Sequence, residues 1–137
     1  MVLGIEVNLL AVFVATIVGH IIGFLWYGPL LGKAWMKMMN FTKDDMKSMK
    51  IGPMFAMTLS VVIALITNYI LAVFLGVSGA NSIAEGLSVG FWLWLGFAMP
   101  LNLGVFLWEG RPFKLFLFNT AQYLIAILLA ASIIVIW

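Results

Sequence analysis

The fold is decided by long apolar stretches, of which residues 53–77 are the clearest: they read PMFAMTLSVVIALITNYILAVFLGV. None of these residues is charged. At about 1.5 Å per residue, a helix of this length crosses the roughly 30 Å of hydrocarbon in a bilayer. Inside lipid, each backbone polar group needs a partner within the segment, and an α-helix provides it. The stretch therefore predicts a transmembrane helix.

Three further stretches have the same character. They lie at residues 7–27, 83–108 and 113–137. Charged residues occur only at the edges of these stretches, and each is long enough to span the hydrocarbon as a helix. The sequence therefore predicts an all-α protein, a four-transmembrane-helix bundle in which residues 1–137 form a single transmembrane domain.

The composition excludes a soluble protein. Of the 137 residues, 65% are hydrophobic and 9% are charged, and the mean hydropathy is +1.18. Soluble domains are about 45–50% apolar and about 25% charged. A water-soluble chain of this size cannot bury so much apolar surface. The chain also has no cysteine, which excludes disulfide frameworks and thiolate metal sites.

All seven basic residues lie in two of the connections between these stretches. Five lysines fall between the first and second stretches, and Arg111 and Lys114 accompany the connection between the third and fourth. The positive-inside rule places both connections in the cytoplasm. We therefore expect a protein of the bacterial inner (cytoplasmic) membrane, with the N-terminus and the C-terminus outside.

The first connection, residues 30–50, predicts a cytoplasmic amphipathic helical segment. Lysines occupy a different face from the apolar residues, and a second short helix is expected to begin at Thr42. We expect the segment to lie on the bilayer with its lysines toward anionic lipid. A docking face for a partner protein, or a gating element, is the alternative. The apolar residues at helical spacing are Leu31, Ala34, Trp35, Met38 and Met39.

Uncharged polar side chains share one depth in the inner leaflet. Counted from the cytoplasmic ends of the stretches, His20 lies about 10 Å deep, Asn102 and Asn119 about 9 Å, and Gln122 about 13 Å. Helical spacing places Tyr27 on the same face of the first stretch as His20. It places Tyr123 on the same face of the fourth stretch as Asn119 and Gln122. The residues expected to line a shared cavity or bind a ligand are His20, Asn102, Asn119, Gln122, Tyr123 and Tyr27.

Two interpretations of this polar layer remain open. In the first, the groups form hydrogen-bonded contacts between helices, each contributing about 0.6 kcal/mol. Alternatively, they line a cavity that binds a polar solute or conducts an ion or proton, with His20 as the titratable member. The second interpretation predicts a homo-oligomeric channel or transporter for an ion or small solute. The alternative function is a non-catalytic accessory or assembly subunit of a larger membrane complex.

The sequence gives little support for other classes of function. It has a single histidine and no nucleotide-binding glycine loop, so we do not expect an enzyme. We also expect no cofactor, no metal site and no nucleic-acid partner. The expected partners are the lipid bilayer, further copies of the chain and another membrane protein.

Two motifs carry a resemblance to a known family. Residues 26–35 read WYGPLLGKAW, and residues 109–116 read EGRPFKLF and are followed by Asn119. With Phe41-Thr42-Lys43, these motifs resemble the small bacterial membrane proteins filed as domain of unknown function 1761. The resemblance covers nearly the whole chain. It implies an integral membrane protein with four spans, and it implies no established activity.

Both motifs fall at the expected cytoplasmic boundary. Gly28-Pro29 should end the first helix there. Arg111 is expected to form an ion pair that clamps the cytoplasmic segment against the bundle; the alternative is contact of Arg111 and Lys114 with lipid phosphates. The acidic residues considered as part of the clamp are Glu109, Asp44 and Asp45.

Overall fold

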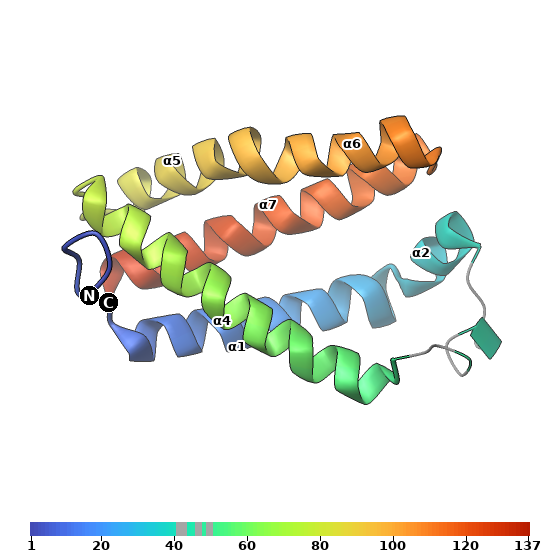
Figure 1. Ribbon diagram of the computed structural model, residues 1–137, viewed down its shortest axis with the longest axis horizontal. Helices are drawn as coiled ribbons and strands as arrows, with labels where there is room; N and C mark the ends of the chain where they lie inside the picture. Colours follow the sequence, from blue (N-terminus) through green and yellow to red (C-terminus); the bar gives the residue numbers. More distant parts are fainter. Residues whose placement is uncertain (41–43, 46–47, 49–50) are drawn as a thin grey trace.

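The computed structural model describes residues 1–40, 44–45, 48 and 51–137, and these residues are mainly helical (Figure 1). Apart from one isolated bridge between Val2 and Ile5, the described ranges contain no β-structure. The helices, in chain order, are α1 (Leu9–Leu25), the π-helical turn η1 (Trp26–Leu30), α2 (Gly32–Met39), α4 (Pro53–Val77), α5 (Ile83–Leu93), the π-helical turn η2 (Trp94–Ala98), α6 (Met99–Glu109) and α7 (Phe113–Ile136).

Four helical segments are long and apolar enough to cross a membrane, which confirms the prediction of an all-helical protein with four such helices. The third runs through α5, η2 and α6 without a break. The first ends at η1, where Gly28 has non-helical backbone angles and Pro29 follows it. The four segments are Leu9–Leu30, Met54–Val77, Ile83–Glu109 and Phe113–Ile136.

Helix α7 lies at the centre of the helix packing. It has α1 on one side and the α5–α6 segment on the other, while α4 crosses α1 (Figure 1). The buried core lies toward the end of the molecule that holds both termini. Its members are Ala15, Leu71, Leu75, Ala130 and Ala131.

Two glycines allow α5 to approach α7 closely. A Cβ atom on Gly86 would lie 2.9 Å from Cγ1 of Val135, and one on Gly90 would lie 3.4 Å from Cβ of Ala131. Small residues four positions apart commonly bring two membrane helices into direct backbone contact. The Gly86-x-x-x-Gly90 pair therefore forms a helix–helix contact within a single chain, between α5 and α7.

Helix α4 buries one face of its second half, although Ile66 and Val77 in that half are 60% and 56% exposed. None of the described side chains in its first half is buried. The side chains of Asn68, Leu71 and Val73 are at most 9% exposed, whereas Met54 is 82% and Ile63 is 62% exposed. Figure 1 shows the beginning of α4 diverging from α7. Residues of this first half of α4 and of α1 line a groove between the two helices.

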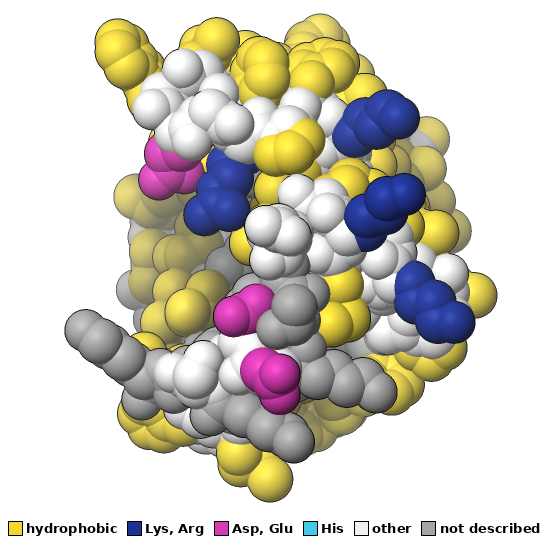
Figure 2. Space-filling model, turned by 90° about the vertical axis from the view of Figure 1, so that its right-hand side faces the viewer, with side chains coloured by type: hydrophobic (Ala, Val, Ile, Leu, Met, Phe, Trp, Pro, Cys, Tyr) yellow, Lys and Arg dark blue, Asp and Glu magenta, His cyan; other side chains and the backbone are white. Residues whose placement is uncertain are grey.

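The end of the molecule opposite the termini carries the described Lys and Arg side chains (Figure 2). Helix α2 lies at this end against η1 and α7, with the ring of Trp35 5.6 Å from that of Tyr27. Lys33 and Lys37 are exposed. Of the short helix expected from Thr42, the structure describes residues 44–45, which are helical, and residue 48; the other residues of that expected helix lie outside the described ranges.

Candidate functional site

A row of polar side chains joins α1 to α4. The hydroxyl of Thr16 donates to the carbonyl of Val12 (2.8 Å) and accepts a hydrogen bond from Nδ2 of Asn68 (3.0 Å). On the next turn of α1, Nδ1 of His20 lies 2.9 Å from the carbonyl oxygen of Thr16, and Nε2 lies 3.3 Å from Oγ of Ser60. Because a carbonyl only accepts, Nδ1 of His20 carries a proton.

His20 lines the groove between α1 and α4, which has a volume of about 430 Å³. Thr16 and His20 are the polar members of a lining that is otherwise apolar. Sites for small ligands are typically about 300–1,000 Å³, mostly apolar, with a few polar groups that orient the ligand. The apolar lining residues are Phe13, Ile17, Ile21, Phe24, Leu25, Met57, Val61 and Leu65.

A second polar cluster lies between the end of the first span and α7. The hydroxyl of Tyr27 donates to Oδ1 of Asn119 at 2.8 Å. Gln122 is only 7% exposed and lies opposite Gly23, where a Cβ atom would be 3.9 Å from Nε2 of the glutamine. Among the described residues, the Gln122 amide makes no hydrogen bond, and the buried Nε1 of Trp26 has no partner either.

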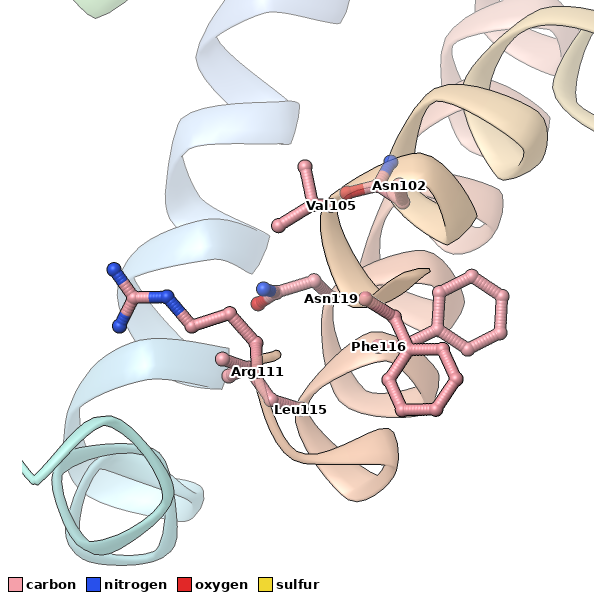
Figure 3. Close-up of a pocket in the computed structure, with 7 residues that line it drawn as sticks. Asn102, Val105, Arg111, Leu115, Phe116 and Asn119 are labelled. Atoms are coloured by element: carbon pink, nitrogen blue, oxygen red, sulfur yellow. The ribbon is translucent and has the colours of Figure 1, made fainter. Parts of the chain in front are cut away.

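Asn119 also lines a small pocket with Asn102 and Arg111. Figure 3 shows the two amides on neighbouring helices and Arg111 in the connection that precedes α7. Nδ2 of Asn102 donates to the carbonyl of Ala98 at 2.8 Å. The pocket volume is about 20 Å³, which is sufficient for about one water molecule.

The structure thus divides the expected polar layer between two places. Tyr27, Asn119 and Asn102 are connected through the hydrogen bond and the small pocket, whereas His20 faces α4 and the groove. Tyr123 lies on α7 and is 46% exposed. Helical spacing predicted that Tyr27 and His20 share one face, but Tyr27 contacts α7 through Asn119, whereas His20 contacts α4.

The contact of Arg111 with the first connection involves α2. Its Nη1 lies 4.0 Å from Sδ of Met39. Glu109 is exposed at the last residue of α6, and Asp44 and Asp45 are exposed as well. The recorded link between Arg111 and α2 is therefore a weak N–H···S contact.

Sequence reasoning missed Ser60 and Asn68, which complete the polar row on α4. The count of residues from the helix end, which gave the depth of His20, could also have identified Ser60. Ser60 follows Pro53 by seven residues, so it lies about 10 Å from the first residue of its helix. This is the depth estimated for His20, and extending the estimate to α4 would have paired the two.

Four apolar helices of membrane-spanning length, with basic residues at one end, fit an integral membrane protein. The chain belongs to the family described as Protein of unknown function (DUF1761), whose model matches residues 10–135. No curated protein and no solved structure matches it.

Proposed function

We propose that this protein is a transporter that binds a small amphipathic solute in the groove between α1 and α4. The observation that carries the proposal is the groove of about 430 Å³, whose lining is apolar except at His20 and at Thr16, of which Thr16 is only 3% exposed. Such a lining suits a molecule with an apolar body and one polar end. The groove lies between membrane-spanning helices, so a solute dissolved in the bilayer would reach it laterally.

The same geometry favours a carried solute over a conducted ion. The pocket at Asn102 and Asn119 has room for about one water molecule, and the larger groove is lined almost entirely by hydrocarbon. A permeating ion needs polar or charged groups to replace its hydration shell. We therefore propose a non-catalytic carrier.

The proposed carrier is a homo-oligomer that lies in the membrane with its basic end in the cytoplasm. The groove extends from Phe13 to Leu25 along α1, about 18 Å, whereas the hydrocarbon is roughly 30 Å thick. A second copy would supply the remainder of the path. Lys33, Lys37 and Lys114 would contact anionic lipid headgroups from the cytoplasmic side.

Filling the groove tests the proposal. Val61 lines it, whereas the neighbouring Val62 is 48% exposed and does not. In proteoliposomes, a decanol analogue with a photoreactive diazirine should label α1 and α4 of the native chain. Val61→Phe should reduce this labelling about tenfold, while Val62→Phe should leave it unchanged. Labelling that spreads equally over α6, or responds equally to both variants, would show an ordinary lipid-facing surface and reject the proposal.

Carriage across the bilayer is measured as counterflow of radiolabelled octanoate. Passive permeation is not saturable and is insensitive to a single side chain, so a carrier is revealed by saturable exchange that Val61→Phe abolishes and Val62→Phe retains. Exchange identical to that of protein-free liposomes would contradict transport.

The divergence of the first half of α4 from α7 favours a second candidate function, that of an accessory subunit of a larger membrane complex. Its large exposed side chains, such as Met54 and Ile63, offer a surface on which a helix of a larger complex would pack. In that case, the groove of the isolated chain would bind no amphiphile, and a cysteine placed at Val61 would cross-link to a different protein in the native membrane.

A further inference from the structure

Arg111 has no anionic partner within the described part of the chain. All five Asp and Glu residues belong to that part, and none of them forms an ion pair with its guanidinium. Its recorded contact is the weak one with Sδ of Met39, at 4.0 Å. A guanidinium has a planar fork of N–H donors that binds carboxylates and phosphates through parallel hydrogen bonds. Most of this donor capacity is therefore available to a ligand.

The beginning of α7, directly after Arg111, adds to this positive charge. Its N-cap, Pro112, provides no side-chain hydrogen bond, and its first turn contains no acidic residue. The backbone N–H groups of Phe113 and Lys114 have no partner among the described residues. The positive end of the helix dipole therefore reinforces the attraction of Arg111 for an anion.

The amide of Asn119 provides a further donor in the pocket that Arg111 lines. Its Oδ1 accepts the hydrogen bond from Tyr27 at 2.8 Å, and its Nδ2 has no partner in the described ranges. Figure 3 shows the side chains of Asn119 and Arg111 extending in the same direction, one from α7 and one from the connection before it. A ligand that contacts one of them can therefore reach the other.

The two donors lie at different depths in the membrane. Asn119 follows the first residue of α7 by six positions, so its Cα lies about 9 Å farther along the span. Apolar side chains complete the pocket, and the rings of Phe106, Phe113 and Phe116 lie in series with centroids 5.2 and 5.5 Å apart. A phospholipid has the same order of groups, with the phosphate outermost, the ester carbonyls deeper and the acyl chains deepest.

We infer that one anionic phospholipid binds at this pocket between α6 and α7. The guanidinium of Arg111 binds its phosphate, and Nδ2 of Asn119 donates to an ester carbonyl. The pocket has room for about one water molecule, so the lipid lies across its opening. Basic pockets between membrane helices on the cytoplasmic side are typical sites for lipid headgroups. The site is separate from the groove between α1 and α4 and does not depend on carriage of a solute there.

Charge favours an anionic lipid over a zwitterionic one. Arg111 and Lys114 carry two positive charges in residues 109–114, against the one negative charge of Glu109. A free phosphate ion would also satisfy Arg111. It has no carbonyl group for Asn119, however, and no hydrocarbon chain for the neighbouring aromatic rings. The combined surface therefore favours the lipid over a soluble anion.

Native mass spectrometry of the purified chain in detergent counts bound lipids directly. The native chain should retain one phosphatidylglycerol molecule. Arg111→Gln should weaken this binding about tenfold, because it removes the charged donor. Lys114→Gln removes an equal charge from an exposed position outside the pocket and should weaken it only about twofold. Equal weakening by the two variants would show general surface attraction and overturn the inference.

The role of Asn119 is tested while Arg111 stays in place. Asn119→Leu should weaken phosphatidylglycerol binding about threefold. Tyr27→Phe removes the same hydrogen bond between helices but keeps the amide, so it should bind the lipid as the native chain does. Equal affinities of Asn119→Leu and the native chain would overturn the assignment of Asn119.

Competition distinguishes the lipid from a soluble anion. Millimolar inorganic phosphate or glycerol 3-phosphate should leave the bound phosphatidylglycerol in place. Phosphatidylcholine, which has the same phosphate and ester groups but no net charge, should bind more weakly. Displacement of the lipid by either soluble phosphate would show a site for free anions, and equal binding of the two lipids would show that charge does not select the headgroup. Either result overturns the inference.

Discussion

At the scale of single residues, the molecule contains both paired and unpaired polar groups. Tyr27 and Asn119 share a hydrogen bond, while Gln122, although 93% buried, has none among the described residues. The sequence could predict that such residues lie at one depth, because depth follows from counting. It could not predict their partners, since these depend on the rotation of each helix about its axis and on which helices are neighbours: His20 contacts Ser60 of α4, and Tyr27 contacts Asn119 of α7.

Gln122→Leu should stabilise the protein. A buried polar group without a partner costs about 1–3 kcal/mol, and leucine has a similar volume without the polar atoms. We expect the free energy of unfolding in mixed micelles to rise by about 1 kcal/mol or more. Asn119→Leu, which removes a hydrogen bond with Tyr27, should instead lower it by about 0.6 kcal/mol. A loss of stability in Gln122→Leu as large as that in Asn119→Leu would show that the amide is satisfied.

At the scale of helices, hydropathy predicted the number and approximate extent of the apolar segments because both follow from bilayer thickness. It did not predict the π-helical turns η1 and η2 or the divergence of α4. These features depend on how neighbouring helices pack, and they determine where the groove lies. The close contact of α5 with α7 depends on packing in the same way.

Gly86→Ala should weaken the contact between α5 and α7. The new methyl group would lie 2.9 Å from Cγ1 of Val135 and 3.3 Å from the carbonyl of Ala131, so one of the helices has to shift. Overpacking of this kind costs about 1–3 kcal/mol, measured as a lower free energy of unfolding. Gly104→Ala is the matched control, because a Cβ there meets nothing within 4 Å. Equal effects of the two substitutions would indicate that close packing at Gly86 is unimportant.

At the scale of the whole molecule, charge is segregated along the long axis. The described Lys and Arg side chains lie at one end, and the two termini lie at the other (Figures 1 and 2). The positive-inside rule predicts that the basic end faces the cytoplasm. This arrangement was predictable from sequence, because it requires only the order of the helices and the positions of seven basic residues.

The absence of native cysteine allows the orientation to be tested with single cysteines. Asn81→Cys lies in the exposed connection between α4 and α5, and Ser48→Cys lies in the connection that follows α2. A membrane-impermeant maleimide should label Asn81→Cys in intact cells and label Ser48→Cys only after permeabilisation. The reverse pattern would invert the orientation.

Helix α4 is closely packed in its second half, whereas in its first half Ser60 contacts His20 of α1. Its buried residues begin at Asn68, while Met54 at the other end is 82% exposed. A tilt of about 10° about Asn68 would move Met54, about 21 Å away along the helix, by about 4 Å. That displacement would widen or close the groove while the tightly packed end stayed in place. Such a tilt would have to break the contact between Ser60 and His20, so the polar row between α1 and α4 would limit the opening of the groove.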